Sequence, residues 1–378
     1  MSTRAAVATV GLKAKLGLIQ VPTITPTGEQ VRVRVEWTAS TPLDLHQNDG
    51  GLLVTHPQVL GDGTAGTIVE VGPGAKRLRV GDKVLGSRGG VRRRRVSRSL
   101  SRWMSGSLRR LVCGQGFASR VLSMRELSEG FTLPEAVTLP NNFVTVFHAL
   151  TTDLGVELPW PRPDACSPAS AHSPFLVWGG SSSVGQFAIQ ILQYYGYTNI
   201  LATASRKQHH KLRRLRAKAL FDYSDDGIVS SLLREGGDAG IPLILDCIGS
   251  KYGSIVPISQ VAKNGAKIAI LLPAIVRDSS ETEAPEYEMD VQKVADWEKG
   301  VDARGVRTHF YAENEFFKHH LQSDIMPTML KDGIVEPQRQ KAVDGATLLE
   351  RAQKAMDMLR RKEASMERLV WRVSDTDA

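Results

Sequence analysis

The sequence predicts an α/β protein that combines a β-rich domain with a doubly wound parallel sheet. The chain has 378 residues, more than one average domain needs, so two domains are expected. Near the start, VRVRVEW (31–37) alternates with a period of two, which is typical of a β-strand. Between residues 175 and 272, short apolar runs alternate with helix-like segments, and this alternation predicts parallel strands covered by helices.

The individual elements follow from the same patterns. GTIVEVG (66–72) and KVLG (83–86) continue the β-rich part as short strands joined by glycine turns, a pattern typical of a β-barrel. The parallel sheet is expected to use the runs at 175–179, 199–205, 218–223, 242–249 and 266–272. A helix is expected at 141–155, a proline-rich surface loop at 157–174, an acidic loop or lid at 281–290, a helix at 347–363 and a last strand at 369–373.

The net charge of +8 comes from one segment. Residues 87–128 hold eleven arginines and one glutamate with little periodicity, and the rest of the chain is almost neutral. Such a segment could bind nucleic-acid phosphates, but Trp103 is its only aromatic residue before Phe117, which leaves little to stack bases. No apolar run is long enough to span a membrane, and three scattered cysteines suit a reducing compartment, so a cytoplasmic protein is expected.

A glycine–serine loop, GGSSSVG (179–185), joins a buried strand to the start of a helix. It fits the dinucleotide pattern G-x-G-x-x-G with serine at the middle position. Backbone N–H groups and the helix dipole would face a pyrophosphate, and the serine hydroxyls would add donors. The residues expected to hold it are Gly180, Ser181, Ser182, Ser183, Val184 and Gly185. The alternative is an ordinary strand-to-helix turn.

The end of the following strand indicates which dinucleotide would bind. An acidic residue about 20 positions after the loop would bind a ribose 2′-hydroxyl, whereas a basic residue accommodates a 2′-phosphate. Ser205, Arg206 and Lys207 occupy this place, which favours NADP(H). The alternative is a solvated basic helix start.

Several motifs together resemble the medium-chain dehydrogenase/reductase superfamily, in its zinc-independent, quinone-reductase-like branch of fungal enoyl reductases. They are LGDGTAGTIVEVGPG (60–74), VGDKV (80–84), LPNNFVTVFHAL (139–150), the glycine–serine loop, FDY (221–223) and LDCIGS (245–250). The resemblance implies a GroES-like catalytic domain over 1–145, a Rossmann domain over 146–312, and a return to the catalytic domain over 313–378. It covers nearly everything except residues 87–128.

The resemblance also implies roles for single residues. Tyr223 would pack near the adenosine ribose, and Leu271 and Leu272 would approach the nicotinamide. Thr145 would lie beside the nicotinamide. His46 would act as a general acid or a ribose contact, because its pKa lies near working pH; a purely structural histidine is the alternative.

Zinc ligands of the superfamily are missing. Thr41 stands where zinc-binding members have a cysteine, Asp62-Gly63 stands where they have a His-Glu pair, and three cysteines cannot form a four-cysteine zinc site. The sequence therefore predicts no metal.

Two departures from the family bear on stability. Residues 87–128 are rich in arginine and serine and lack periodicity, as a shifted reading frame or a mis-spliced exon would be. Most of them are expected at the surface or disordered. Arg216 replaces the glycine that usually ends the preceding helix, so a strained left-handed arginine is expected there.

The function implied by the resemblance is NADPH-dependent reduction of an α,β-unsaturated carbonyl in fungal secondary-metabolite biosynthesis. The substrate would be a small enone or enoyl compound, free or as a carrier-bound polyketide. An NADPH quinone reductase is the near alternative. Two alternatives from other functional classes also stay open: a catalytically impaired cofactor-binding protein and a nucleic-acid-binding protein. The chain is expected to be a monomer or a homodimer.

Overall fold

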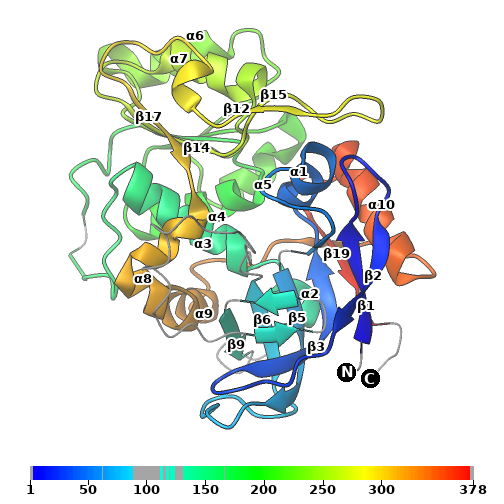
Figure 1. Ribbon diagram of the computed structural model, residues 1–378. Coiled ribbons are helices and arrows are strands. Elements are labelled where there is room, and N and C mark those ends of the chain that lie inside the picture. Colours follow the sequence, from blue (N-terminus) through cyan, green and yellow to red (C-terminus); the bar gives the residue numbers. More distant parts are fainter. Residues whose placement is uncertain are drawn as a thin grey trace, which may run out of the picture. The chain divides into compact units, whose positions relative to one another are not determined.

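A computed structural model describes residues 3–61, 63–87, 111–113, 116–118, 120–123, 131–165 and 167–374 (Figure 1). The chain divides into two compact units. Unit 1 contains residues 1–141, 339–364 and 368–378, and unit 2 contains residues 142–338 and 365–367. Within the described residues, no helix is both long and apolar enough to cross a bilayer.

Unit 1 is the β-rich part. Its strands are β1 (Thr3–Thr9), β2 (Gly17–Pro22), β3 (Val31–Ala39), β4 (Gln58–Val59), β5 (Gly63–Val71), β6 (Lys83–Ser87), β7 (Leu111–Cys113), β8 (Gly116–Ala118), β9 (Arg120–Ser123), β18 (Gln340–Ala342) and β19 (Arg368–Arg372). Its helices are α1 (Pro42–Gly50), α2 (Leu133–Ala136) and α10 (Leu348–Arg360). The larger sheet runs β18-β19-β3-β5-β6-β9, with β7 pairing β3 and β8. The strands expected at 31–37, 66–72, 83–86 and 369–373 are therefore confirmed.

Unit 2 carries a six-stranded parallel sheet in the order β12-β11-β10-β13-β14-β17. The strands are β10 (Phe175–Trp178), β11 (Ile200–Thr203), β12 (Ala219–Phe221), β13 (Leu243–Asp246), β14 (Lys267–Leu271) and β17 (Asp302–Val306), with a separate hairpin of β15 (Ala274–Arg277) and β16 (Glu286–Glu288). Its helices are α3 (Pro140–His148), α4 (Ser183–Tyr194), α5 (His209–Arg214), α6 (Ile228–Gly236), α7 (Val256–Val261), α8 (Glu315–His320) and α9 (Met326–Lys331). The expected doubly wound sheet is confirmed.

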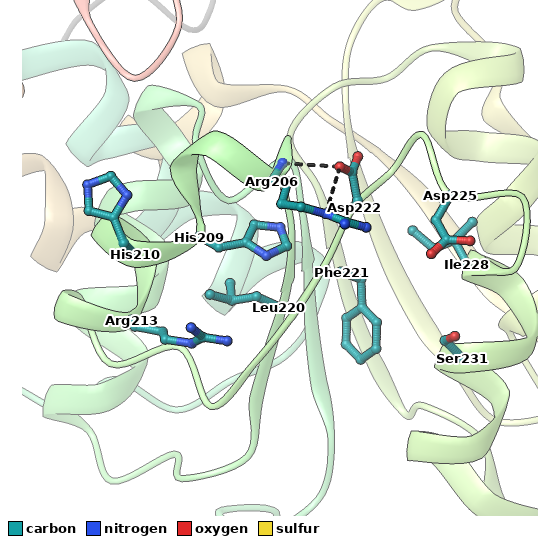
Figure 2. A pocket seen from close by; sticks show the side chains of 10 residues that line it. All are labelled: Arg206, His209, His210, Arg213, Leu220, Phe221, Asp222, Asp225, Ile228 and Ser231. Atoms are coloured by element: carbon teal, nitrogen blue, oxygen red, sulfur yellow. Dashed lines mark hydrogen bonds and ion pairs between the residues drawn. The ribbon is translucent and has the colours of Figure 1, made fainter.

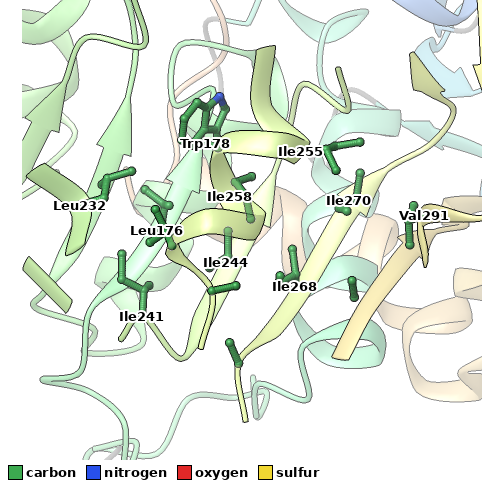
Figure 3. Close-up of a cluster of buried hydrophobic side chains, with 14 of the residues drawn as sticks. Leu176, Trp178, Leu232, Ile241, Ile244, Ile255, Ile258, Ile268, Ile270 and Val291 are labelled. Atoms are coloured by element: carbon green, nitrogen blue, oxygen red, sulfur yellow. The ribbon is translucent and has the colours of Figure 1, made fainter. Parts of the chain in front are cut away.

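Apolar side chains from strands and helices form the core of unit 2 (Figure 3). Leu176 and Trp178 on β10 project to one face of the sheet, where Leu232 of α6 and Ile255 and Ile258 pack. On the neighbouring helices, the rings of Phe143 in α3 and Phe187 in α4 lie edge to face at 6.0 Å. The helices therefore pack apolar side chains against one another and against the strands of this sheet.

In the segment 87–128, Ser87 and residues 111–113, 116–118 and 120–123 lie in paired strands, and the remainder lies outside the described residues, so the expectation that most of it is at the surface or disordered stays a prediction. Two other sequence expectations need correction. The acidic stretch 281–290 is partly a strand, because Glu286–Glu288 pairs with β15. The second domain boundary falls at 338/339 instead of 312/313, since α8 packs within unit 2 through the rings of Phe317 and Phe147.

The backbone at Arg216 confirms the expected strain. Its φ is 73°, and its N–H donates to the carbonyl of Arg213 at the end of α5. An L-residue other than glycine rarely adopts this left-handed conformation, so the turn after α5 costs stability.

Candidate dinucleotide-binding site

The glycine–serine loop lies at the carboxyl end of β10, where the strand order of the sheet reverses. Strands β11 and β12 lie on one side of β10, and β13 and β14 lie on the other. Ligands of open α/β sheets bind at such a reversal, outside the carboxyl ends of the strands. The loop is therefore where a dinucleotide would be expected.

Close backbone contacts explain the glycines of this loop. A Cβ added at Gly185 would come within 2.4 Å of the Gly179 carbonyl oxygen and 2.8 Å of the Gly180 Cα. Gly179 has φ +81°, and its N–H donates to the Thr203 hydroxyl at 2.9 Å. The loop can fold tightly against the sheet only because these positions lack side chains.

Ser182 caps the helix that follows. Its Oγ accepts a hydrogen bond from the Gly185 N–H at 3.0 Å, and its hydroxyl also hydrogen-bonds the thiol of Cys247. The expectation that the Ser182 hydroxyl donates to the phosphates stays a prediction; in the structure its oxygen serves the helix start. Of the N–H groups of Ser183, Val184 and Gly185 at the start of α4, the contacts within the described residues pair only that of Gly185, leaving two donors for an anion.

A second loop, Cys247–Gly249 after β13, packs beside the glycine–serine loop and was missed by sequence reasoning. The buried Asp246 carboxylate accepts N–H groups of Ile248 at 2.9 Å and Gly249 at 3.1 Å. Its other oxygen accepts the hydroxyl of Ser254 at 2.7 Å. Loss of solvation raises the pKa of Asp246 to about 6, and burial likewise raises the pKa of the Cys247 thiol.

The loop after β13 also reaches β14. A Cβ at Gly249 would lie 2.4 Å from the carbonyl oxygen of Leu271, and one at Gly179 would lie 2.6 Å from the Ile248 side chain. The ends of β10, β13 and β14 are thus in direct contact. Leu271 and Leu272, expected near a nicotinamide, lie at this common edge, at and just after the end of β14.

The turn after β11 opens onto a cavity of about 510 Å³ (Figure 2). Its lining residues come from the segment Arg206–Arg213, from β12 and from the start of α6: Arg206, His209, His210, Arg213, Leu220, Phe221, Asp222, Asp225, Ile228 and Ser231. Of the expected triplet, only Arg206 lines it; Ser205 and Lys207 do not. Arg213, on helix α5, also lines the cavity and was missed, because the sequence pattern inspects only the residues directly after the strand.

A carboxylate lies beside this turn in the structure, although none is close to it in the sequence. Asp222, which follows β12, accepts the Arg206 N–H at 3.1 Å, and its Oδ2 lies 4.0 Å from the Arg206 Nε. Asp222 follows the next strand of the sheet. The sequence pattern concerns only the position about 20 residues after the glycine–serine loop, so it does not reveal Asp222. Tyr223, the neighbouring residue, is half exposed and does not line the cavity.

Thr145 lies buried on α3 in the same unit. The Thr308 hydroxyl donates to the Thr145 Oγ1 at 3.1 Å. One turn later, burial lowers the pKa of His148, with His309 adding to the effect. These groups place hydroxyl and imidazole donors around α3.

His46 belongs to unit 1 and is described there. It lies on α1, whose first turn is held by a capping box between Thr41 and Asp44. The Thr41 N–H donates to the Asp44 carboxylate at 2.8 Å, and the Gly61 N–H donates to the other oxygen at 3.1 Å. Asp62 lies outside the described residues, and the described part of the chain contains no group of three metal-ligating side chains.

Known proteins match both parts of the chain. Residues 27–137 match the alcohol dehydrogenase GroES-like domain. The trans-enoyl reductase himH of Aspergillus japonicus is 29% identical over 58% of the chain and 59% of its own length, and the trans-enoyl reductase tazE of Aspergillus terreus is 29% identical over 55% and 64%. A quinone oxidoreductase structure from Coxiella burnetii has a TM-score of 0.68 at 19% identity, covering 99% of this chain and 100% of that one.

These matches support the medium-chain dehydrogenase/reductase superfamily: residues 27–137 match its GroES-like domain, the sequence is similar to trans-enoyl reductases, and the fold is similar to that of a quinone oxidoreductase. The chain spans about six tenths of the length of the trans-enoyl reductases that it matches. The superfamily consists of oxidoreductases with a nicotinamide cofactor, and the uncapped N–H groups at a glycine-built helix start fit the pyrophosphate of such a cofactor.

Proposed function

We propose that this medium-chain reductase uses NADPH to reduce the carbon–carbon double bond of an α,β-unsaturated carbonyl in fungal secondary metabolism. The observation that carries the proposal is the Gly179–Gly185 loop at the reversal of the sheet, with Arg206 beside a cavity at the end of the next strand. The names of the relatives himH and tazE support an enoyl substrate. When bound, the nicotinamide supplies the hydride that reduces the β-carbon.

The chain's own residues would bind the cofactor and orient it. The N–H groups of Ser183 and Val184, at the positive end of α4, would hold the pyrophosphate. Ser181 and Ser182, with Gly180 and Gly185, would shape that loop. Arg206, with Ser205 and Lys207 beside it, would hold the 2′-phosphate, because a guanidinium forms charge-assisted hydrogen bonds to phosphate oxygens.

At the reacting end, Leu271, Leu272 and Thr145 would border the nicotinamide and exclude water from it. Tyr223 would pack against the adenosine ribose, and His46 would hold a proton for the substrate or contact a ribose. Negative charge that develops on the carbonyl oxygen of the substrate would need hydrogen-bond donors nearby to stabilise it. The substrate is a small unsaturated carbonyl compound, free or as a carrier-bound polyketide, and the protein would work in the cytoplasm as a monomer or homodimer.

We also propose that the reaction needs no zinc. Thr41, which stands where zinc-binding members have a cysteine, has no thiolate to offer, and its hydroxyl is engaged with Asp44 in the capping box of α1. Elemental analysis of the purified protein should find no stoichiometric zinc, and a chelator should leave activity unchanged. About one zinc per chain would refute this part of the proposal.

The test of the reaction is NADPH oxidation with a panel of enones, enoyl thioesters and quinones, followed by product identification. Saturated carbonyl products would support the proposal. Turnover confined to quinones would favour the alternative of a quinone reductase, which the likeness in fold to the Coxiella protein keeps open.

The sequence of 87–128 adds a condition to that test. Eleven arginines with one acidic partner cannot all be paired in a core, and an unpaired buried charge costs several kcal/mol. We therefore expect cofactor binding with poor turnover, and restored turnover when a family-like segment is grafted between Gly86 and Gly130. Full activity of the chain as written would contradict this expectation.

A further inference from the structure

We propose that Asp222 sets the strength of 2′-phosphate recognition by competing with the phosphate for Arg206. The inference rests on the proposed NADPH site and concerns a carboxylate that the proposed site residues leave out. Asp222 and Arg206 face each other at the rim of the cavity, on the loops after two adjacent strands (Figure 2).

The position of Asp222 is fixed by the backbone. One carboxylate oxygen accepts the Ser224 N–H at 3.0 Å and the other accepts the Arg206 N–H at 3.1 Å. Its side chain is only 18% exposed, whereas that of Arg206 is 81% exposed. The carboxylate is therefore the fixed member of the pair, and the guanidinium is the mobile one.

The charge of Asp222 is also maintained. The N–H of Ser224, with further hydrogen bonds from Arg206, lowers the pKa of this carboxyl group, so it stays ionised at neutral pH. Any 2′-phosphate that pairs with Arg206 must draw the guanidinium from this carboxylate, and must approach a second negative charge in doing so. A like charge at this range opposes binding of a phosphate.

NADH lacks the 2′-phosphate and does not meet this opposition. Asp222 would thus weaken the binding of NADPH without changing the binding of NADH. The affinities for the two cofactors would then differ less than they would with Arg206 alone. A second arginine, Arg213 on α5, also lines the cavity, and within the described residues it forms no ion pair with Asp222.

The test compares binding of 2′,5′-ADP and 5′-ADP, two nicotinamide-free probes, by isothermal titration calorimetry. Asp222→Asn should tighten 2′,5′-ADP binding about fivefold, the equivalent of releasing one exposed ion pair worth ~1 kcal/mol, with 5′-ADP unchanged. In an Arg206→Ala background the same substitution should have a smaller effect, because the contested guanidinium is gone and only the repulsion between carboxylate and phosphate is relieved.

Asp225→Asn is the matched control. Asp225 lines the same cavity, but its carboxylate accepts the Gly227 N–H at 2.8 Å, and within the described part of the chain it forms no hydrogen bond or ion pair with Arg206. The affinity of the Asp225→Asn variant for 2′,5′-ADP should differ from that of the unmodified protein by less than about twofold. Equal tightening by both variants would mean a general charge effect, and weaker binding by Asp222→Asn would mean that Asp222 merely positions Arg206; either result overturns the proposal.

Folding is monitored by thermal unfolding, since Asn can replace only one of the two hydrogen-bonded oxygens. Asp222→Ser provides a second variant without the charge. If the unmodified protein binds 2′,5′-ADP no tighter than 5′-ADP, the proposed NADPH preference fails. If it does bind tighter but Asp222→Asn changes nothing, only the competition fails.

Discussion

The loop after β10 and the turn after β11 are neighbours in the sheet, yet they are specified in different ways. In the loop after β10, atoms of the backbone touch: a Cβ at Gly185 would overlap the Gly179 carbonyl. In the turn after β11, an exposed guanidinium meets a carboxylate from another strand. Steric exclusion permits one residue type, whereas a surface charge pair tolerates several, so the first region should be far less tolerant of substitution.

Gly185→Ala should produce the largest effect. The added methyl group meets backbone atoms that cannot move without opening the loop, which should cost about 2–3 kcal/mol of stability. Binding of NADPH should weaken about 100-fold, because the N–H groups at the start of α4 would be displaced. Calorimetry and thermal unfolding would measure both.

Gly11→Ala is the control for that substitution, since its added Cβ would meet only the Ala14 Cβ at 3.6 Å, an ordinary contact. It should leave NADPH affinity unchanged. If Gly185→Ala behaved like Gly11→Ala, the loop would not be sterically specified.

Asp246→Asn tests the loop that packs against the glycine–serine loop. Because the folded-state pKa of Asp246 is raised to about 6, the native protein holds this proton between about pH 4 and 6 while the unfolded chain has lost it. The unfolding free energy of the unmodified protein should therefore fall, relative to that of the variant, by about 2–3 kcal/mol as pH rises from 4 to 7. Urea unfolding at several pH values would measure it, and parallel curves for the two proteins would contradict the assignment.

Replacing Arg206 and Lys207 together by alanine probes the charged turn. The preference for NADPH over NADH should fall by about tenfold, or ~1.4 kcal/mol, with NADH affinity unchanged. Because Lys207 does not line the cavity, Arg206→Ala alone should account for most of the loss. Lys211→Ala with Arg214→Ala, on the same basic helix but outside the cavity lining, should leave the preference intact.

Arg216→Gly should have the smallest effect, and a favourable one. Relief of the left-handed conformation, partly offset by the entropy of glycine in the unfolded chain, should raise stability by about 0.5–1 kcal/mol. Lys211→Gly, inside α5, should lower stability by a similar amount. A loss of stability at Arg216→Gly would show that the arginine side chain makes a compensating contact.

The same contrast explains what the sequence could predict. The parallel sheet and the glycine–serine loop were predictable, because apolar periodicity and glycine spacing are local properties of the chain. The strained Arg216 was predicted from the family resemblance, in which a glycine ends the preceding helix. The cap formed by Ser182, the pairing of Asp222 with Arg206 and the anchoring of the loop after β13 by Asp246 were not, because each depends on side chains that only the folded sheet brings together.

Elements in the charged parts were also harder to predict. Strand β16 lies in an acidic stretch whose composition favours a loop, and it forms because β15 offers it a pairing edge. Strands β7 to β9 lie in an arginine-rich segment without visible alternation, and they add to β3 and β6 through backbone hydrogen bonds that any side chains allow.

The most direct test of the account is a calorimetric titration of the unmodified protein with NADPH and with NADH in the same buffer and salt. The account predicts that both bind, through the loop after β10, and that NADPH binds at least about tenfold tighter, through the turn after β11. Equal affinity for the two cofactors would contradict the role given to Arg206, and absence of binding by either would contradict the assignment of the glycine–serine loop.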